Sequence, residues 1–150
     1  MPEIVNKQRK IKINKANLQN FANTAAAEIS ETNGRNFTVA FISDKRMREL
    51  NQSFRRKNST TDVLSFPFEA DEFEIESESA DFAGDYLGDI VISAEQARKQ
   101  SEENNLDFEI ETKQLILHGI LHLCGYDHET DNGEMNRREL KLREILKISG

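Results

Sequence analysis

The sequence contains little cysteine and no long apolar run. Of its 150 residues only Cys124 is a cysteine, and tryptophan is absent. A single thiol excludes an internal disulfide framework and any zinc finger built on two or more thiolates. No stretch approaches the roughly 18 apolar residues that a membrane-spanning helix needs, and the N-terminus lacks the apolar core of a secretory signal. We therefore expect a cytoplasmic protein with no membrane partner, folded as one domain over residues 1–150.

Positive charge is missing from one long stretch. Residues 58–97 hold 11 acidic residues and no lysine or arginine, whereas residues 1–57 hold 12 basic and 5 acidic residues. The net charge of −7 argues against simple electrostatic binding of nucleic acid. The segregation is compatible with a basic groove beside an acidic lobe, but also with charges that intermix in three dimensions.

Hydrophobic periodicity predicts strands and helices in mixed order. Strands are expected at residues 4–13 (one strand or a bent pair), 37–42, 62–66 and 87–92. Helices are expected at about residues 18–29, after Ser43, after Ser93, and at about 109–124 and 132–147. We predict an α+β domain in which a mixed sheet of about four strands packs with four to six helices.

Local signals place several of the predicted helix ends. Asn33-Gly34 is expected to close the first helix. Ser93 with Gln96, and Asp131 with Glu134, have the spacing of capping boxes at helix starts. The acidic segment 69–85 shows no clean period, and we interpret it as a mobile surface insertion.

All three histidines lie in one segment, HGILHLCGYDH, as His118, His122 and His128. On a helix, residues four apart differ by about 40° around the axis, so the first two can reach one ion. Gly125 can adopt the left-handed conformation that ends helices, which would let the chain double back and deliver His128. A chance surface cluster is the alternative. The pattern predicts one zinc ion, Zn²⁺, per chain, although imidazoles also accept nickel, copper or iron.

Three nitrogen ligands leave a fourth position for water or substrate, which is typical of a catalytic zinc site. Cys124 is a rival ligand, but it lies about 160° around the helix from His122. We therefore expect Cys124 in the core and not on the metal.

One side chain of a familiar metal motif is absent. HxxxHxxGxxH resembles the HExxHxxGxxH helix of zinc proteases, so we expect a zincin-like metal-binding helix. Gly119 stands where those enzymes carry their glutamate general base, so peptide hydrolysis by that route is unsupported. Glycine inside a helix costs about 1 kcal/mol, so it needs a reason. Either it leaves room for a bulky group such as a phosphate, or a neighbouring strand or helix packs closely against it.

The histidine segment also resembles the signature of the YbeY endoribonucleases, bacterial ribosomal-RNA maturation factors. LNQSFRRKNSTTDVLSFPFE (residues 50–69) and LGDIVIS (residues 87–93) resemble two further blocks of that family, and the likeness extends over about residues 37–147. The resemblance implies a zinc-dependent hydrolase that cuts single-stranded RNA in 16S rRNA 3′-end maturation and ribosome quality control. It also implies a single α+β domain with the metal in a cleft. Ribosomal RNA and the small ribosomal subunit are the implied partners, and DNA is not.

The same resemblance marks Arg55, which follows Phe54, as a catalytic residue. Its planar guanidinium suits the oxygens of a phosphate, although the residues alone, without the resemblance, favour a solvated charge near a helix end. Arg56 and Lys57 extend the basic run toward an RNA backbone, or merely form a solvated face. Phe54 and Tyr126 could stack on bases, but we expect buried packing for both.

The general base is unassigned. Asp127 and Asp89 are candidates, and orienting a liganding histidine is the alternative role of Asp127. Two other functions stay open on the sequence: a ribosome-assembly factor whose zinc does no chemistry, and a zinc protease.

Overall fold

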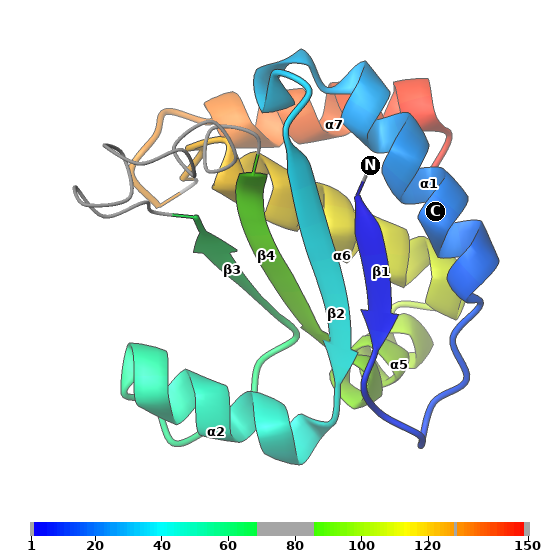
Figure 1. The fold of residues 1–150 in the computed structure, drawn as a ribbon, viewed down its shortest axis with the longest axis vertical. Helices are drawn as coiled ribbons and strands as arrows, with labels where there is room; N and C mark the ends of the chain where they lie inside the picture. The colour runs from blue at the N-terminus through cyan, green and yellow to red at the C-terminus, as the bar shows by residue number, and fades with distance from the viewer. Residues whose placement is uncertain (1, 69–85, 128, 149–150) are drawn as a thin grey trace, which may run out of the picture.

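A four-stranded mixed sheet forms the centre of the computed structural model, which describes residues 2–68, 86–127 and 129–148 (Figure 1). The strand order is β1-β2-β4-β3. The strands are β1 (Glu3–Asn6), β2 (Asn36–Ile42), β3 (Val63–Pro67) and β4 (Tyr86–Ser93). β1, β2 and β4 run parallel, and β3 pairs with β4 in the antiparallel direction. The predicted α+β class and mixed sheet are confirmed.

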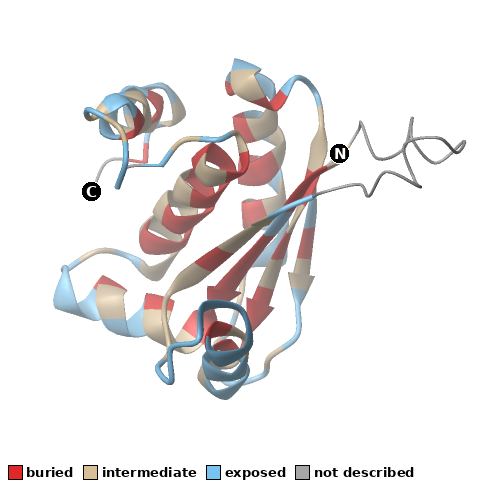
Figure 2. Cartoon of the chain, turned by 90° about the vertical axis from the view of Figure 1, so that its left-hand side faces the viewer, coloured by how far each residue is buried: buried red, intermediate tan, exposed pale blue. Residues whose placement is uncertain are grey.

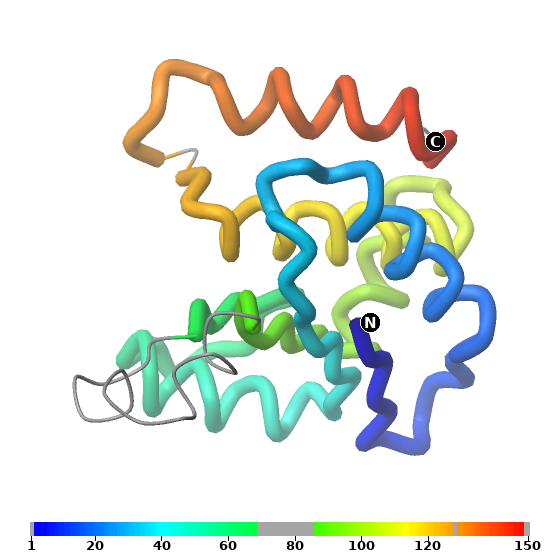
Figure 3. Tube along the Cα trace, turned by 45° about the horizontal axis from the view of Figure 1, so that its top comes forward, coloured from blue at the N-terminus to red at the C-terminus, as the bar shows by residue number. Residues whose placement is uncertain are grey.

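Five α-helices and one short 3-10 helix, η1, surround the sheet in the described residues. They are α1 (Lys15–Glu28), η1 (Ser30–Thr32), α2 (Asp44–Arg55), α5 (Ala94–Glu103), α6 (Phe108–Leu123) and α7 (Glu134–Leu146). Figure 3 shows α6 lying between the sheet and α7, so the helices on this side form two layers. None of the helices in the described part of the chain is long and apolar enough to cross a membrane.

The main core lies between the sheet and the α1–α6 layer. Phe37, Val39 and Phe41 alternate along β2 and are all buried on this side, as the period of a strand requires. Ile90 and Ile92 of β4 continue the same surface, and the buried residues gather along the sheet and the helices beside it (Figure 2). This packing fixes the distance between α6 and β4.

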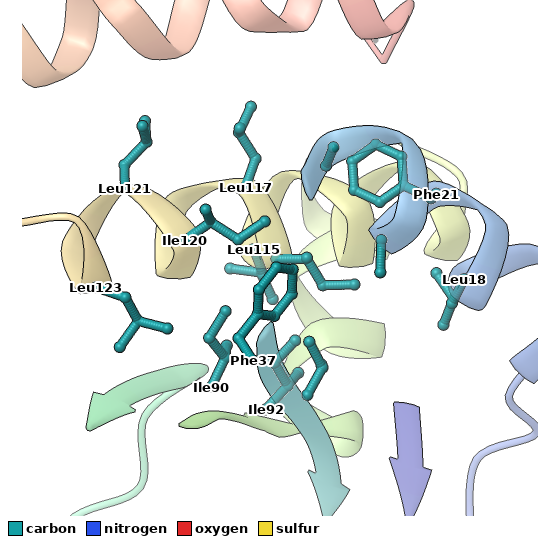
Figure 4. Packing of buried hydrophobic residues seen from close by; sticks show 14 of the residues in the cluster. Leu18, Phe21, Phe37, Ile90, Ile92, Leu115, Leu117, Ile120, Leu121 and Leu123 are labelled. Atoms are coloured by element: carbon teal, nitrogen blue, oxygen red, sulfur yellow. The ribbon is translucent and has the colours of Figure 1, made fainter. Parts of the chain in front are cut away.

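α6 is buried on two sides. Leu117 and Leu121 point toward α7, whereas Leu123 points toward the sheet (Figure 4). All three side chains are buried. Only a narrow strip of this helix is left for polar side chains, and His118 and His122 occupy it.

α2 packs on the opposite face of the sheet. Met47 is fully buried there against Ile42, Leu64 and Val91. The helix begins after Ser43 as predicted, and the side chain of Ser43 caps it by accepting a hydrogen bond from the backbone N–H of Arg46 (3.2 Å). This cap fixes the start of α2, whose other end carries Arg55.

The first strand is shorter than predicted. Beyond Asn6 the chain leaves the sheet, because Gln8 bonds the backbone of Ile11 instead: its amide accepts from the Ile11 N–H (2.9 Å) and donates to the Ile11 carbonyl (2.8 Å). The Gln8 side chain thus takes the place of the backbone hydrogen bonds that a neighbouring strand would make with Ile11. Ile11 and Ile13 still pack partly against the main core.

The capping predictions hold in part. Ser93 caps α5, but the Gln96 side chain donates to Asp44 (3.4 Å). α7 begins after Gly133, and Asp131 accepts from the backbone N–H groups of Gly133 and Met135. α1 ends at Glu28, and Asn33-Gly34 instead follows η1, with Asn33 in the left-handed region at φ 53°. The predicted insertion at 69–85 lies outside the described residues.

Candidate metal centre and active-site cleft

His118 and His122 face each other across one turn of α6. Their Nε2 atoms are 3.1 Å apart, and the ring planes are inclined at 74°. Two imidazole nitrogens on one tetrahedral zinc ion lie about 3.3 Å apart, given zinc–nitrogen bonds of about 2.0–2.1 Å. The spacing and the chemistry of the two donors therefore fit a zinc ion held between them.

The other ring nitrogen of His118 faces a carboxylate. Its Nδ1 lies 3.5 Å from Oε1 of Glu139, on α7, and the same oxygen lies 3.6 Å from the Arg143 guanidinium. Burial works to raise the pKa of Glu139, but the hydrogen bond and charge of His118 and the charge of Arg143 outweigh it and hold that pKa below its usual value. Sequence reasoning missed Glu139, because no local spacing signals a contact between two separate helices.

The turn after α6 has the form expected for a chain that doubles back. Gly125 has φ +100°, in the left-handed region. Its N–H donates to the His122 carbonyl (3.0 Å), and the Tyr126 N–H donates to the Leu121 carbonyl (3.1 Å), which together make a Schellman motif. The turn thus ends α6 directly after the second histidine. His128, the third predicted ligand, lies outside the described residues.

A charged network holds Tyr126, which follows the glycine of this turn. Tyr126 donates from its hydroxyl to Glu31 (2.8 Å), and Arg138 of α7 donates to both oxygens of the same carboxylate (2.8 Å each). The hydrogen bond from Arg138, helped by the one from Tyr126 and opposed by burial, lowers the pKa of Glu31 to about 2. Tyr126 is half-buried and packs against the main core, so the burial predicted for it is met in part.

Arg55 and the histidine pair line the same cleft. The cleft has a volume of about 550 Å³, and β3 forms one wall of it. Its described lining includes the acidic residues Asp62, Asp127 and Glu129, and Arg55 is the single lysine or arginine among the described lining residues. The structure therefore brings together three of the four predicted site residues, all those that it describes.

Arg55 is the last residue of α2, and its side chain is exposed. Arg56 follows in the left-handed conformation at φ 56° and ends the helix. The expected burial of Phe54 is wrong, because its side chain is 65% exposed. Among the aromatic contacts of the described residues, Phe54 makes one, an edge contact with Phe66 at a centroid distance of 5.1 Å. Met47 already fills the apolar contact between α2 and the sheet, which leaves the end of the helix outside the core.

Gly119 packs against the sheet. A Cβ built at this position would lie 2.7 Å from Cγ2 of Ile90 on β4, which is closer than atoms approach without a shift. The structure therefore favours close packing over room for a phosphate. Cys124 packs against the main core as expected, and burial raises the pKa of its thiol to about 11, with a smaller contribution from the charge of Glu31.

The two candidate bases lie in different places. Asp127 lines the cleft, where its carboxylate accepts from the Glu129 backbone N–H (3.0 Å). Asp89 lines a separate hollow on the other face of the sheet, and the Tyr86 hydroxyl donates to it. Of the two, only Asp127 is positioned beside the histidines.

The fold and the site together define a class: α+β proteins in which a helix packed on a mixed sheet presents facing histidines to an open cleft. Within this class the chain belongs to the endoribonuclease YbeY family. The family model described as Endoribonuclease YbeY matches residues 3–148.

Individual relatives agree with the family assignment. The Endoribonuclease YbeY of Aquifex aeolicus is 38% identical over 146 residues, covering 95% of this chain and 89% of that protein. The protein of the same name from Nautilia profundicola is 46% identical over 105 residues, covering 70% of this chain and 68% of the relative. A solution structure of a Thermotoga maritima protein superposes with a TM-score of 0.62 at 28% identity, covering 97% of this chain and 89% of that one.

Proposed function

We propose that this chain is a single-domain (residues 1–150), zinc-dependent endoribonuclease that hydrolyses single-stranded RNA. Membership of the family gives the reaction class, a metal-dependent hydrolase that acts on RNA. The observation that carries the proposal is the shared cleft, in which Arg55 and the facing pair His118 and His122 line one hollow.

His118 and His122, together with His128, would hold one zinc ion. A zinc ion bound there supplies a Lewis acid for a phosphoryl oxygen and lowers the pKa of water. The support from the structure is the 3.1 Å separation of the two Nε2 atoms and the carboxylate of Glu139 behind His118. The Schellman turn at Gly125 directs the chain that leads to His128 away from the axis of α6.

Arg55 would bind the phosphate next to the scissile bond. Its guanidinium can donate two parallel hydrogen bonds to phosphate oxygens and stabilise the charge that builds there during hydrolysis. The acidic side chains of Asp62, Asp127 and Glu129 repel phosphates elsewhere along the described lining. A phosphodiester therefore enters this cleft most favourably beside Arg55.

Asp127 is the one candidate base that lies in the cleft, and no proton transfer is assigned to it. Its carboxylate already orders the turn through the Glu129 N–H. A cleft aspartate with one oxygen so engaged retains acceptor capacity toward substrate or solvent.

The biological setting follows the family. We propose ribosomal RNA as the substrate, in 16S rRNA 3′-end maturation and ribosome quality control in the cytoplasm, with the small ribosomal subunit as partner. A zinc protease is not favoured, because Gly119 supplies no carboxylate and faces Ile90. An assembly factor with a purely structural zinc is not favoured, because the members of the family are named endoribonucleases.

End-labelled RNA provides the test. The zinc-loaded chain should cut a single-stranded oligonucleotide and leave the matching duplex largely intact, lose activity when a chelator removes the metal, and regain it with added zinc. His118→Ala, purified in parallel, should lose at least about 100-fold in rate, because a metal ligand is gone. Equal cleavage by this variant would assign the activity to a contaminant. A zinc-loaded wild type that leaves single-stranded RNA intact would overturn the proposal in favour of the assembly factor.

A further inference from the structure

We propose that Glu139 is a positioning residue of the metal centre, which holds His118 so that its Nε2 atom points at the ion. The inference rests on the proposed function, because it assumes that His118 is a ligand. It assigns a task to α7, a helix that contributes none of the residues lining the described cleft.

The two nitrogens of His118 have partners on opposite sides. Nε2 faces His122 at 3.1 Å, whereas Nδ1 faces Glu139 at 3.5 Å. A neutral imidazole carries one proton, and a carboxylate beside Nδ1 favours the tautomer with that proton on Nδ1. The lone pair is then left on Nε2, the atom that faces the second histidine.

The contact is longer than an ordinary N–H···O hydrogen bond of about 2.7–3.2 Å. Its influence is therefore electrostatic as well as directional. A negative carboxylate makes the imidazole a stronger donor to a cation, and partners of this kind commonly fix the ring orientation of metal-binding histidines.

Glu139 is held in place from two directions. Its side chain is only 12% exposed, and Arg143, one turn further along α7, lies 3.6 Å from the same oxygen that faces His118. α7 itself is anchored on α6, with Met135 and Leu142 fully buried in the main core. A buried carboxylate keeps its charge only when it is paired, and on the described elements packed around it Arg143 supplies the opposite charge while Nδ1 of His118 faces it.

The simpler alternative is an ordinary intrahelical ion pair. Exposed pairs at this spacing contribute little to stability and need no burial. Glu139 instead points into the contact between α7 and α6, where one of its two partners is a histidine of the cleft. Glu144 on the same helix is exposed and serves as the matched control.

Zinc affinity is the first measurement. We compare wild type, Glu139→Ala, Glu139→Gln and the control Glu144→Gln by competition with a chromogenic chelator. Glu139→Ala should bind zinc about 10–100-fold more weakly, in the range seen for lost partners of metal-binding histidines. Glu139→Gln should bind with intermediate affinity, because an amide oxygen still accepts from Nδ1 but has no charge. Glu144→Gln should match wild type.

The tautomer of His118 in the metal-free protein is the second measurement, by nitrogen-15 NMR. Wild type should show the proton on Nδ1, and Glu139→Ala should shift the population toward Nε2. A merely structural role would lower the melting temperature of the metal-free protein and leave both affinity and tautomer unchanged. If Glu139→Ala does not fold, Glu139→Gln decides by the same readouts.

Two results separate this inference from the proposed function. The role of Glu139 alone is overturned if wild type binds zinc, Glu139→Ala has a zinc affinity within twofold of wild type, and the His118 tautomer is unchanged. Wild type that binds no zinc overturns both.

Discussion

The two walls of the cleft are built in different ways. On one wall, His118 and His122 project from a helix buried on two sides, and Glu139 and Arg143 of α7 support the first of them. On the other wall, Arg55 stands at the exposed end of α2, and no hydrogen bond or ion pair of its side chain is seen among the described residues.

This difference indicates separate tasks. Metal ligands must be held in a fixed geometry before the ion arrives, because ordering them afterwards costs binding free energy. A phosphate-binding guanidinium can remain solvated until the substrate pairs with it. Substitutions on the histidine wall should therefore change stability and metal binding, whereas substitution of Arg55 should change catalysis alone.

Arg55→Ala tests the difference between the two walls with the largest expected effect. We expect RNA cleavage to fall by about 10²–10³-fold, as when a comparable oxyanion donor is removed, with the melting temperature and zinc content unchanged. Single-turnover cleavage of labelled RNA, thermal unfolding and metal analysis on one preparation make the measurement.

Arg48→Ala is the control for Arg55→Ala. Arg48 is an exposed arginine of the same helix that does not line the cleft. If both variants lost cleavage equally, general electrostatic attraction to RNA would explain Arg55, and its specific role would be wrong.

Glu31 stabilises the wall that carries His118 and His122 by bonding both Tyr126, which follows α6, and Arg138 of α7. The pKa of Glu31 is about 2 in the folded protein against a usual value of 4.5, so its pairing stabilises the fold fully above pH 4.5 and loses this effect as the pH falls toward 2. Glu31→Gln should therefore lower the free energy of unfolding at pH 7 by about 2–3 kcal/mol. Urea unfolding from pH 7 down to pH 2 should show the gap to wild type closing.

Glu28→Gln tests whether this effect belongs to the network. Glu28 is exposed at the end of α1, and its loss should leave stability nearly unchanged at every pH. A gap between Glu31→Gln and wild type that stays constant down to pH 2 would contradict the pairing with Arg138 and Tyr126.

A smaller effect is expected at the contact between α6 and β4. Gly119→Ala places a Cβ 2.7 Å from Cγ2 of Ile90, and we expect a net loss of about 1–2 kcal/mol after the gain in helix propensity. Thermal unfolding of Gly119→Ala, Ile90→Val and the double variant gives the coupling. Crowding predicts a double variant less destabilised than the sum, since Ile90→Val removes Cδ1, which lies 3.0 Å from that Cβ. Simple additivity would argue against close packing as the reason for this glycine.

Local periodicity was sufficient to predict much of the fold and one face of the site. The strand at Phe37–Ile42, the start of α2 after Ser43 and the facing histidines all depend on residues within one or two turns of each other. These features can be predicted from the sequence because the periods of strands and helices decide which side chains share a face.

The failures have different physical causes, one of them local and the others in the packing of helices. The strand predicted through Ile11 and Ile13 does not form, because the Gln8 side chain makes hydrogen bonds with the backbone of Ile11. Phe54 stayed outside the core because Met47 already fills the contact between α2 and the sheet. Glu139 reaches His118 only through the packing of α7 on α6, and no sequence spacing encodes that contact.

The proposed zinc site has three imidazole ligands and an open fourth position. X-ray absorption at the zinc edge of the untagged, purified chain measures this most directly. We expect one zinc per chain with three imidazole nitrogens at about 2.0–2.1 Å and one exchangeable light-atom ligand. A sulfur neighbour from Cys124, a fourth protein ligand, or a chain that purifies without metal and does not take up zinc would contradict it.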